Sequence, residues 1–456
     1  MSDRILIVGH GTAGLTLADD IRRRGGDVAG FLDDRVAGDG VLGTLADVNQ
    51  VVARHAIDLV YFAIPTVRAE TVRDFINSIE SKTVDIAIVP RTYDILAKDT
   101  VSIDDLTDVD VLDLVGREPV KHDVLVAQQF LTGKKVMVTG AAGSIGSRLV
   151  RNILGAGAAQ VICVDWWENG MFYLTQSLGS VDGLTPVIAD VKSRPHLDLL
   201  FTEFSPDIVF HAAAYKHVPL MQHNALEAVN NNIWGSLNLM QLAIEHGVEN
   251  FVYVSTDKAV NPVNVMGTTK RLGEMMMEAL ADGSHRTRFT AVRFGNVIES
   301  NGSVMQTFRS QIAQKKPLTV THPDVTRFFM TIDEASQLII QSAALGNDSE
   351  IFVLDMGEPV KILDLAKSLV RAVDPSLEIE ITGLRPGEKM YEELSYEPDK
   401  VGRTGNRKIF VVRGEKDFDR SEFLSSINTL LEDTLAYRIS AADAVERLRG
   451  MGFAIQ

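Results

Sequence analysis

The chain has 456 residues, of which 45% are hydrophobic and 23% charged, so it is long enough to form two substantial hydrophobic cores. Its net charge of −16 repels the phosphates of nucleic acids and of anionic lipid head groups, which argues against both as partners. A single cysteine, Cys163, excludes an internal disulfide and a cysteine-built metal cage, and its apolar surroundings predict a buried thiol.

The first predicted unit is a strand, a glycine loop and a helix in the segment RILIVGHGTAGLTLADDIRRRG. Strands and helices then alternate up to about residue 95, which is typical of a doubly wound parallel sheet. We therefore predict a Rossmann-like domain over residues 1–120. Asp33 or Asp34 could contact a nucleotide ribose there, but no catalytic set follows before residue 130, which favours a fold that is kept for packing or regulation.

A second strand, glycine loop and helix begins at Lys135, in KKVMVTGAAGSIGSRLVRN, and the next predicted strand ends at Asp165. Glycines let the backbone approach a pyrophosphate at a helix N-terminus, and an acid at the end of the second strand binds the adenosine ribose hydroxyls. Asp165 would repel a 2′-phosphate, so the pattern favours NAD over NADP. The predicted cofactor residues are Gly140, Gly143, Ser144, Ile145, Gly146, Asp165, Asp190, Val191, Ala212 and Lys270.

A third segment, STDKAVNPVNVMGTTK, follows the predicted strand NFVYV. Three reactive side chains stand at the carboxyl end of that strand, where open α/β sheets bind ligands: Thr256, Asp257 and Lys258. An adjacent carboxyl group and amine can serve as a general acid and a general base. Met266 and Lys270 lie four residues apart on one face of the next predicted helix, from which Lys270 can reach a nicotinamide ribose.

Six separated segments, in this order, resemble one known protein family, whereas a glycine loop alone would indicate only a broad superfamily. They are VTGAAGSIGS, VFHAAAYKHVPLM, STDKAVNPVNVMGTTK, VRFGNV, TRFFMTIDEA and GLRPGEKMYEEL. Together they resemble the UDP-N-acetylglucosamine 4,6-dehydratases of bacterial polysaccharide biosynthesis, which are extended short-chain dehydrogenase/reductases. The resemblance covers residues 114–400, including LVGREPV. It implies an α/β catalytic domain at 121–410, with a parallel doubly wound sheet and a smaller C-terminal substrate-binding part.

Larger members of this family carry a Rossmann-like domain before the catalytic one, as residues 1–120 do here, and many precede it with membrane helices. This sequence starts directly with the Rossmann-like domain and has no long apolar run or cleavable leader. We therefore expect a cytoplasmic protein without a membrane partner. Residues 411–456 are predicted to form a helical tail that serves packing or assembly, and we expect a homo-oligomer.

The resemblance implies NAD-dependent dehydration of a UDP-N-acetylhexosamine, first of all UDP-N-acetylglucosamine, to the 4-keto-6-deoxy sugar. Hydride leaves C4, the C5 proton is removed, the C6 hydroxyl leaves as water, and hydride returns to C6. By resemblance Asp257 is the acid and Lys258 the base, so Asp257 must be protonated and Lys258 neutral at the elimination. Short-chain dehydrogenases carry a tyrosine where this chain has Met266. We expect Thr256 to relay the C4 hydroxyl proton instead, with Lys270 close by and Met266 as a spacer.

The predicted substrate contacts are Lys216, His217, Asn296, Arg327, Arg385 and Glu388. Asn296 and Arg385 resemble the family's contacts to the nucleotide diphosphate. We predict no metal site, because no cysteine or carboxylate cluster joins the three evenly spaced histidines His211, His217 and His223.

Two other functions stay open from the sequence. A C4 or C5 epimerase on the same scaffold would share the C4 oxidation but lose no water, and the adjacent acid and base at 257 and 258 argue against it. A nucleotide-sensing module with a disabled dehydrogenase site is the second alternative, with Met266 as the damage.

Overall fold

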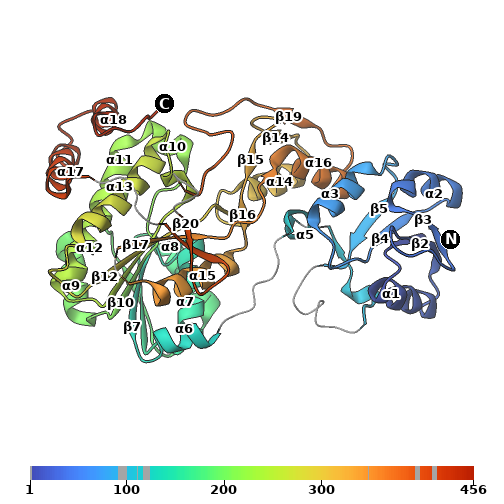
Figure 1. Ribbon diagram of the computed structural model, residues 1–456, viewed down its shortest axis with the longest axis horizontal. Helices are drawn as coiled ribbons and strands as arrows, with labels where there is room; N and C mark the ends of the chain where they lie inside the picture. Colours follow the sequence, from blue (N-terminus) through green and yellow to red (C-terminus); the bar gives the residue numbers. More distant parts are fainter. Residues whose placement is uncertain are drawn as a thin grey trace. The chain divides into compact units, whose positions relative to one another are not determined.

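The computed structural model describes residues 3–90, 100–109, 111–116, 124–347, 349–395, 401–412 and 418–456 (Figure 1). These residues form an α/β fold with two large sheets and flanking helices, which confirms the predicted fold class. They group into two compact units: unit 1 contains residues 1–120, 304–329 and 359–383, and unit 2 contains residues 121–303, 330–358 and 384–456.

Unit 1 contains a six-stranded sheet in the order β3-β2-β1-β4-β5-β6. Its strands are β1 (Arg4–Val8), β2 (Asp27–Leu32), β3 (Val41–Gly43), β4 (Leu59–Phe62), β5 (Asp85–Ile88) and β6 (Thr107–Asp108). Its helices are α1 (Thr12–Arg23), η1 (Leu45–Asp47), α2 (Val48–His55), α3 (Ala69–Ser78), η2 (Ile103–Asp105) and α5 (Val111–Val115). The first five strands are parallel and β6 is antiparallel, so the sheet has the Rossmann-type strand order.

Two later segments of the chain complete unit 1. They contribute α14 (Val304–Ala313), β14 (Leu318–Val320), β15 (Thr326–Arg327), β18 (Val360–Lys361), α16 (Ile362–Val373) and β19 (Ile379–Ile381). Helix α16 packs on α3 (Figure 1), and Arg371 donates hydrogen bonds to the carbonyl groups of Ile79 and Ser81, just beyond α3. The sequence did not indicate a discontinuous unit. The predicted domain limits at residues 120 and 410 stay a prediction, and the first falls at residues outside the described part of the chain.

Unit 2 contains a nine-stranded sheet in the order β20-β21-β17-β12-β11-β10-β7-β8-β9. The strands are β7 (Lys135–Thr139), β8 (Gln160–Asp165), β9 (Leu184–Ile188), β10 (Ile208–His211), β11 (Asn250–Val254), β12 (Arg288–Arg293), β17 (Glu350–Leu354), β20 (Val401–Arg403) and β21 (Ile409–Val412). Strands β17 through β9 in this order are parallel, β21 runs antiparallel to β17, and β20 runs antiparallel to β21. The short strands β13 (Asn296–Val297) and β16 (Phe329–Met330) pair with each other in a separate two-stranded sheet.

The helices of unit 2 pack on this sheet and on one another. They are α6 (Val124–Leu131), α7 (Ser144–Gly155), α8 (Glu168–Leu178), α9 (Arg194–Phe204), α10 (Val218–His223), α11 (Ala225–Val229), the π-helical turn η3 (Asn230–Trp234), α12 (Gly235–Glu245), η4 (Asp257–Ala259), α13 (Val265–Leu280), α15 (Ile332–Leu345), α17 (Arg420–Leu435) and α18 (Ala441–Gly450). Of the predicted C-terminal tail at 411–456, residues 420–435 and 441–450 are helical, whereas residues 411 and 412 belong to β21. Phe423, Ile427 and Leu430 of this tail join the core of the unit.

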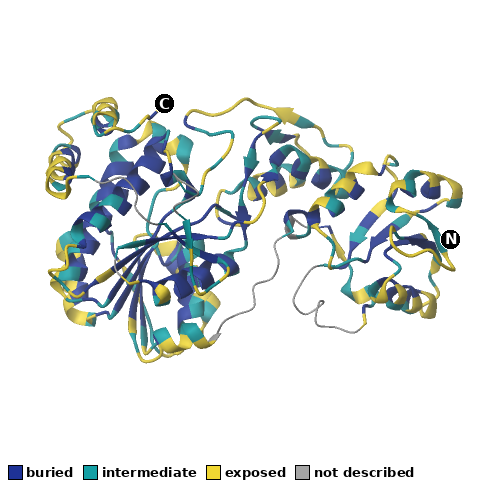
Figure 2. Ribbon diagram, in the orientation of Figure 1, coloured by how far each residue is buried: buried dark blue, intermediate teal, exposed yellow. Residues whose placement is uncertain are grey.

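The central strands of this sheet are buried (Figure 2), and every residue of β10 and β11 is shielded from solvent. A sheet that is covered on both faces needs continuous apolar strands, which explains why the sequence shows apolar runs there. The carboxyl ends of parallel strands meet at one edge, so the residues after β7, β8, β10 and β11 are brought together. Among the described helices, none has the length and apolar character that crossing a bilayer requires.

Candidate active site

The second glycine loop connects β7 to α7, and two of its glycines are fixed by close backbone contacts. Gly140 has φ +69°, and an added Cβ would lie 2.7 Å from the carbonyl carbon of Ala212. A Cβ on Gly146 would lie 2.0 Å from the carbonyl oxygen of Gly140, so glycine is needed for α7 to pack on the loop. Gly143 immediately precedes α7, and its missing side chain leaves room for an anion at the helix N-terminus.

The first turn of α7 carries the other predicted residues of this loop. Ser144 accepts a hydrogen bond at Oγ from the N–H of Asn301 at 3.0 Å, and Ile145 is half-buried. The serine therefore holds a neighbouring loop beside the start of the helix.

Asp165 ends β8 beside the glycine loop. Its Oδ2 accepts a hydrogen bond from the N–H of Ala142 at 3.0 Å, and its Oδ1 accepts one from the N–H of Trp167 at 3.0 Å. Asp190 follows β9, and Val191 is buried against Gly235. Asp165, Asp190 and Val191 thus lie at or just beyond the ends of the adjoining strands β8 and β9, and ribose binding by Asp165 stays a prediction.

Gly146→Ala is expected to lower the free energy of unfolding by about 1–3 kcal/mol and to abolish dinucleotide binding, because the new methyl group would collide with a backbone oxygen. Gly155→Ala, in the same helix, is the matched control, since a Cβ there meets nothing within 4 Å. Urea unfolding and calorimetric NAD binding would measure both. A Gly146→Ala protein that binds NAD like the Gly155→Ala protein would contradict the role of the loop.

Thr256, Asp257 and Lys258 follow β11 and form one hydrogen-bonded cluster. Thr256 Oγ1 donates to Asp257 Oδ1 at 2.8 Å, and Lys258 Nζ donates to the same oxygen at 2.9 Å. The Asp257 side chain is 1% exposed, and its other oxygen, Oδ2, accepts no hydrogen bond from the described residues. A buried carboxylate oxygen without a donor is costly, so a ligand hydroxyl that donates to it would stabilise the cluster.

Two further side chains face Lys258. Asn296 Oδ1 accepts a hydrogen bond from Lys258 Nζ at 3.1 Å, and Glu392 Oε1 lies 3.9 Å from the same nitrogen. The structure therefore places Asn296 against the candidate base, while its predicted diphosphate contact stays a prediction. Glu392 was missed, because nothing in the local pattern distinguishes it from the adjacent Glu393.

Lys270 lies one turn beyond Met266 in α13, and both side chains are buried. The Nζ of Lys270 is 3.9 Å from the ring centroid of Tyr253, an arrangement that stabilises a cation over an aromatic face. Burial lowers the pKa of Lys270 to about 7, although the Glu274 carboxylate opposes the shift. The Tyr253 hydroxyl points toward Gly273, where an added Cβ would lie 2.1 Å from it. Tyr253 therefore supports Lys270 but does not replace the phenol that is missing at Met266.

Lys270→Met is expected to stabilise the protein by a few kcal/mol below about pH 7, because the variant no longer buries a charged amine. Each unit by which folding lowers the pKa of Lys270 corresponds to about 1.4 kcal/mol. Because the folded-state pKa of Lys270 is lowered to about 7, the unfolded chain holds this proton up to about its usual pKa of 10.5 while the folded chain releases it earlier. The free energy of unfolding of the wild type should therefore rise between about pH 7 and pH 10.5. Over the same range the stability difference between Lys270→Met and the wild type should shrink. Urea unfolding of both proteins at about pH 6 and about pH 9 checks this; a constant difference would contradict it.

A buried ion network lies one turn further along α13. The fully buried Glu274 accepts hydrogen bonds from Arg293 at 2.7 and 2.6 Å, from Arg271 at 3.2 Å and from the Ser255 hydroxyl at 2.6 Å. Burial alone would raise the pKa of Glu274, but the two guanidinium groups and the hydroxyl hold it below its usual value. The network ties α13 to β12 and to the residue just before Thr256.

Lys216 and His217 follow β10 and are exposed. The surrounding protein atoms and the Lys258 charge lower the pKa of Lys216, which indicates that the two amines share one region of the molecule. The His217 ring lies where Gly302 has no side chain, since an added Cβ would be 2.3 Å from it. His211 is different: it is buried between Thr139 and Ser236, and burial lowers its pKa to about 3.

The remaining predicted substrate residues are less closely tied to this cluster. Arg385 is exposed and forms an ion pair with Glu388 at 3.1 Å within unit 2. Arg327 belongs to unit 1, where its guanidinium donates to the carbonyl group of Thr326 at 2.7 Å. The substrate contacts of all three stay predictions. Across the described part of the chain, no group of three or more histidine, cysteine or acidic side chains could hold a metal ion.

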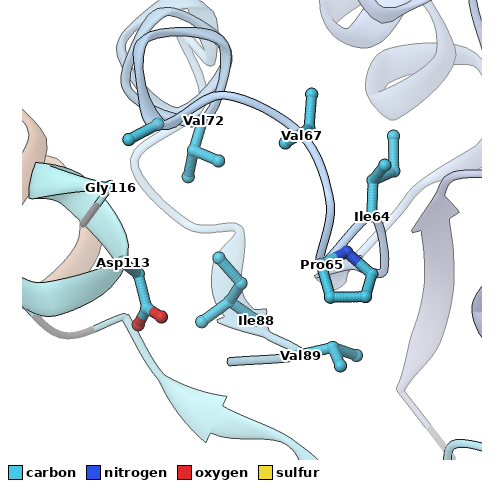
Figure 3. A pocket seen from close by; sticks show the side chains of 9 residues that line it. Ile64, Pro65, Val67, Val72, Ile88, Val89, Asp113 and Gly116 are labelled. Atoms are coloured by element: carbon cyan, nitrogen blue, oxygen red, sulfur yellow. The ribbon is translucent and has the colours of Figure 1, made fainter. Parts of the chain in front are cut away.

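The first glycine loop resembles the second in its construction. Gly9 has φ +107°, a Cβ on Gly14 would lie 1.9 Å from its carbonyl oxygen, and Asp33 accepts a hydrogen bond from the N–H of His10 at 2.7 Å. A hollow of about 290 Å³ lies beyond β4 and β5 and is lined mainly by apolar side chains, with Asp113 at its edge (Figure 3). These features leave the ligand of the first domain open, as the sequence did.

The chain matches two family models. Residues 136–414, more than half of the chain, match the family described as polysaccharide biosynthesis protein. Residues 2–90 match a family described as CoA-binding domain.

Curated relatives carry related names. The capsular polysaccharide biosynthesis protein CapD of Staphylococcus aureus is 44% identical over 78% of this chain and 60% of CapD, so the chain spans about three fifths of that relative. The probable polysaccharide biosynthesis protein EpsC of Bacillus subtilis is 43% identical over 86% of this chain and 68% of EpsC. A UDP-N-acetylglucosamine 4,6-dehydratase (inverting) of Campylobacter jejuni is 32% identical over 57% of this chain and 77% of its own length. A UDP-glucose 4-epimerase of Rickettsia rickettsii is 34% identical over 65% of this chain and 92% of its own length.

Solved structures share the fold. Pen from Bacillus thuringiensis superposes with a TM-score of 0.59 at 30% identity, over 66% of this chain and 99% of Pen. DesIV, a dTDP-glucose 4,6-dehydratase from Streptomyces venezuelae with NAD bound, gives a TM-score of 0.53 at 21% identity, over 57% of this chain and 88% of DesIV. The resemblance drawn from the six sequence segments is thus confirmed, and the chain belongs to the polysaccharide biosynthesis protein family of the extended short-chain dehydrogenase/reductases.

Proposed function

We propose that this chain catalyses the NAD-dependent dehydration of a UDP-N-acetylhexosamine, first of all UDP-N-acetylglucosamine, to the 4-keto-6-deoxy sugar nucleotide. The observation that carries the proposal is the buried cluster of Thr256, Asp257 and Lys258, which joins a hydroxyl, an acid and an amine on one carboxylate oxygen. The relative from Campylobacter jejuni that is named as a UDP-N-acetylglucosamine 4,6-dehydratase supports the choice of substrate.

The residues around the second glycine loop fit NAD. Gly146 lets α7 pack closely on the loop, Gly143 leaves the N-terminus of α7 without a side chain, and the Asp165 carboxylate suits ribose hydroxyls and disfavours a 2′-phosphate. Lys270 is the expected contact of the nicotinamide ribose. When bound, NAD accepts a hydride from C4 of the sugar and gives it back at C6. The NAD that is bound in the structure of DesIV supports this assignment.

The C4 hydroxyl proton has a route through Thr256. The Thr256 hydroxyl already donates to Asp257 Oδ1 at 2.8 Å. A sugar hydroxyl that transfers its proton to the Thr256 oxygen would let Thr256 pass its own proton to Asp257. This step leaves Asp257 protonated, which is the state needed to protonate the departing C6 hydroxyl. The proton removed at C4 thus leaves in the water, and Asp257 returns to a carboxylate without help from solvent.

Lys258 is the base for the C5 proton. While Asp257 is a carboxylate it favours the charged form of Lys258, its partner at 2.9 Å. Protonation of Asp257 in the preceding step removes that negative charge, so the amine becomes easier to neutralise when it is needed. Elimination expels the C6 hydroxyl, and Lys258 can return its proton to C5 as the hydride is delivered to C6.

An epimerase is the second candidate, because the relatives include a protein named UDP-glucose 4-epimerase. Epimerisation at C4 has no leaving group to protonate. A buried acid directly beside an amine therefore favours dehydration over epimerisation.

Mass spectrometry of UDP-N-acetylglucosamine incubated with the full chain and NAD in deuterated water tests the proposal. We expect a product that is lighter by one water and carries one deuterium at C5, with no net consumption of NAD. An isomer of unchanged elemental composition would instead identify an epimerase. Bound NAD with no turnover of any UDP-hexosamine would favour the nucleotide-sensing module.

A further inference from the structure

The loop at residues 384–395 lies against the segment that follows β11. Asn264 Nδ2 donates a hydrogen bond to the carbonyl oxygen of Gly387 at 3.0 Å, and Lys389 Nζ donates to the carbonyl oxygen of Val260 at 2.9 Å. These bonds fix the loop beside the acid and base, although it is more than a hundred residues away in the sequence.

Glu392 is the residue of this loop that faces the candidate base. Its side chain is 4% exposed and its Oε1 lies 3.9 Å from Lys258 Nζ, while Asp257 Oδ1 lies 2.9 Å from the same nitrogen. Lys258 is itself only 18% exposed. Two buried carboxylates therefore face one amine, with Asn296 as a neutral neighbour and the charge of Lys216 nearby.

The proposed dehydration gives these two carboxylates different tasks. Asp257 must carry a proton at the elimination, and at the same moment Lys258 must have lost one. A proton that leaves a buried amine needs an acceptor nearby, since water has little access. Asp257 cannot be that acceptor once it holds the C4 hydroxyl proton.

We propose that Glu392 is the positioning residue that takes this proton, an inference that rests on the proposed function. An N–H bond of the Lys258 ammonium breaks and an O–H bond forms on Glu392, which leaves a neutral amine and a carboxylic acid. Lys258 then takes the C5 proton, delivers one of its exchangeable N–H protons to C5 after the elimination, and regains a proton from Glu392. A shift of the lysine side chain by about 1 Å brings the nitrogen within hydrogen-bond distance of Glu392.

Glu393 supplies a matched control. It has the same chemistry and the same loop, but its side chain is 52% exposed and pairs with Lys389 at 3.4 Å and with Asn261 at 3.0 Å, not with Lys258.

The test compares wild type, Glu392→Gln and Glu393→Gln as full chains with NAD and UDP-N-acetylglucosamine. We expect Glu392→Gln to lower kcat by about 100-fold near neutral pH, with KM changed by less than about twofold. The kcat of Glu392→Gln should recover as the pH rises, because solvent must now take the Lys258 proton. The kcat of wild type and of Glu393→Gln should not change over the same pH range. Glu392→Asp should restore part of the rate. The first-turnover absorbance at 340 nm, which reports C4 oxidation, should form normally in Glu392→Gln.

Three results would overturn the inference. A Glu392→Gln profile parallel to that of wild type shows that Glu392 does not act on Lys258. If Glu392→Gln loses its 340 nm signal to the same extent as its kcat, the variant has a general defect of the site. Circular dichroism separates such a defect from misfolding. A wild-type chain that dehydrates no UDP-hexosamine would remove the proposed function itself, whereas the first two results leave it standing.

Discussion

An Asp257→Asn protein is expected to bind NAD but to show almost no absorbance at 340 nm in its first turnover, with dehydration reduced by about 10²–10⁴-fold. The amide cannot accept the proton that Thr256 would pass from the C4 hydroxyl, so the variant should stop before oxidation. An acid that acted only on the C6 hydroxyl would give the opposite result, because C4 oxidation would then proceed and its product would accumulate. Stopped-flow absorbance with UDP-N-acetylglucosamine measures the difference.

Lys258→Met is the companion variant for this experiment. It removes the base but keeps the hydrogen bond from Thr256 to Asp257, so the 340 nm signal should form and persist while no water is lost. Equal 340 nm signals in the two variants would refute the route through Thr256. NAD retention in both proteins, measured after gel filtration, shows that the cofactor site is intact.

Arg293→Met is expected to lower the free energy of unfolding by about 3–5 kcal/mol, because it leaves the buried Glu274 carboxylate without its bidentate partner. Arg271 would remain, but its hydrogen bond to Glu274 is longer, at 3.2 Å. Urea unfolding at neutral pH is the measurement.

Arg288→Met is the control, since Arg288 is exposed at the start of the same strand, β12. It should change the free energy of unfolding by less than about 0.5 kcal/mol. Adding Glu274→Leu to Arg293→Met should recover part of the loss, because an unpaired buried charge costs more than an apolar replacement. A double variant less stable than Arg293→Met would show that Glu274 stabilises the fold by other contacts.

The parts of the site that could be predicted from the sequence depend on contacts between close neighbours in the chain. The fit of Gly146 against Gly140 is decided within one strand, loop and helix, and Asp165 ends the next strand. The cluster at residues 256–258 is three consecutive residues after a buried strand, so its members had to meet. Local rules for glycine loops and strand ends are sufficient for such contacts.

The parts that could not be predicted depend on contacts between distant segments. Asn296, at the start of β13, and Glu392, in the loop at 384–395, both reach Lys258 from segments whose course the local pattern does not specify. Tyr253 looks like an ordinary aromatic residue of a buried strand, and only the packing of α13 places Lys270 over its ring. The discontinuous composition of unit 1 was missed for the same reason. No local pattern in residues 304–329 or 359–383 indicates that these segments belong with residues 1–120.

The late completion of unit 1 has a consequence for synthesis of the chain on the ribosome. The carbonyl groups of Ile79 and Ser81 receive the Arg371 guanidinium only after nearly 300 further residues are made. At about 5–20 residues per second, that interval is roughly 15–60 s. During this time α3 lacks its partner α16, and surface that the finished protein buries stays exposed, which favours proteolysis and chaperone binding.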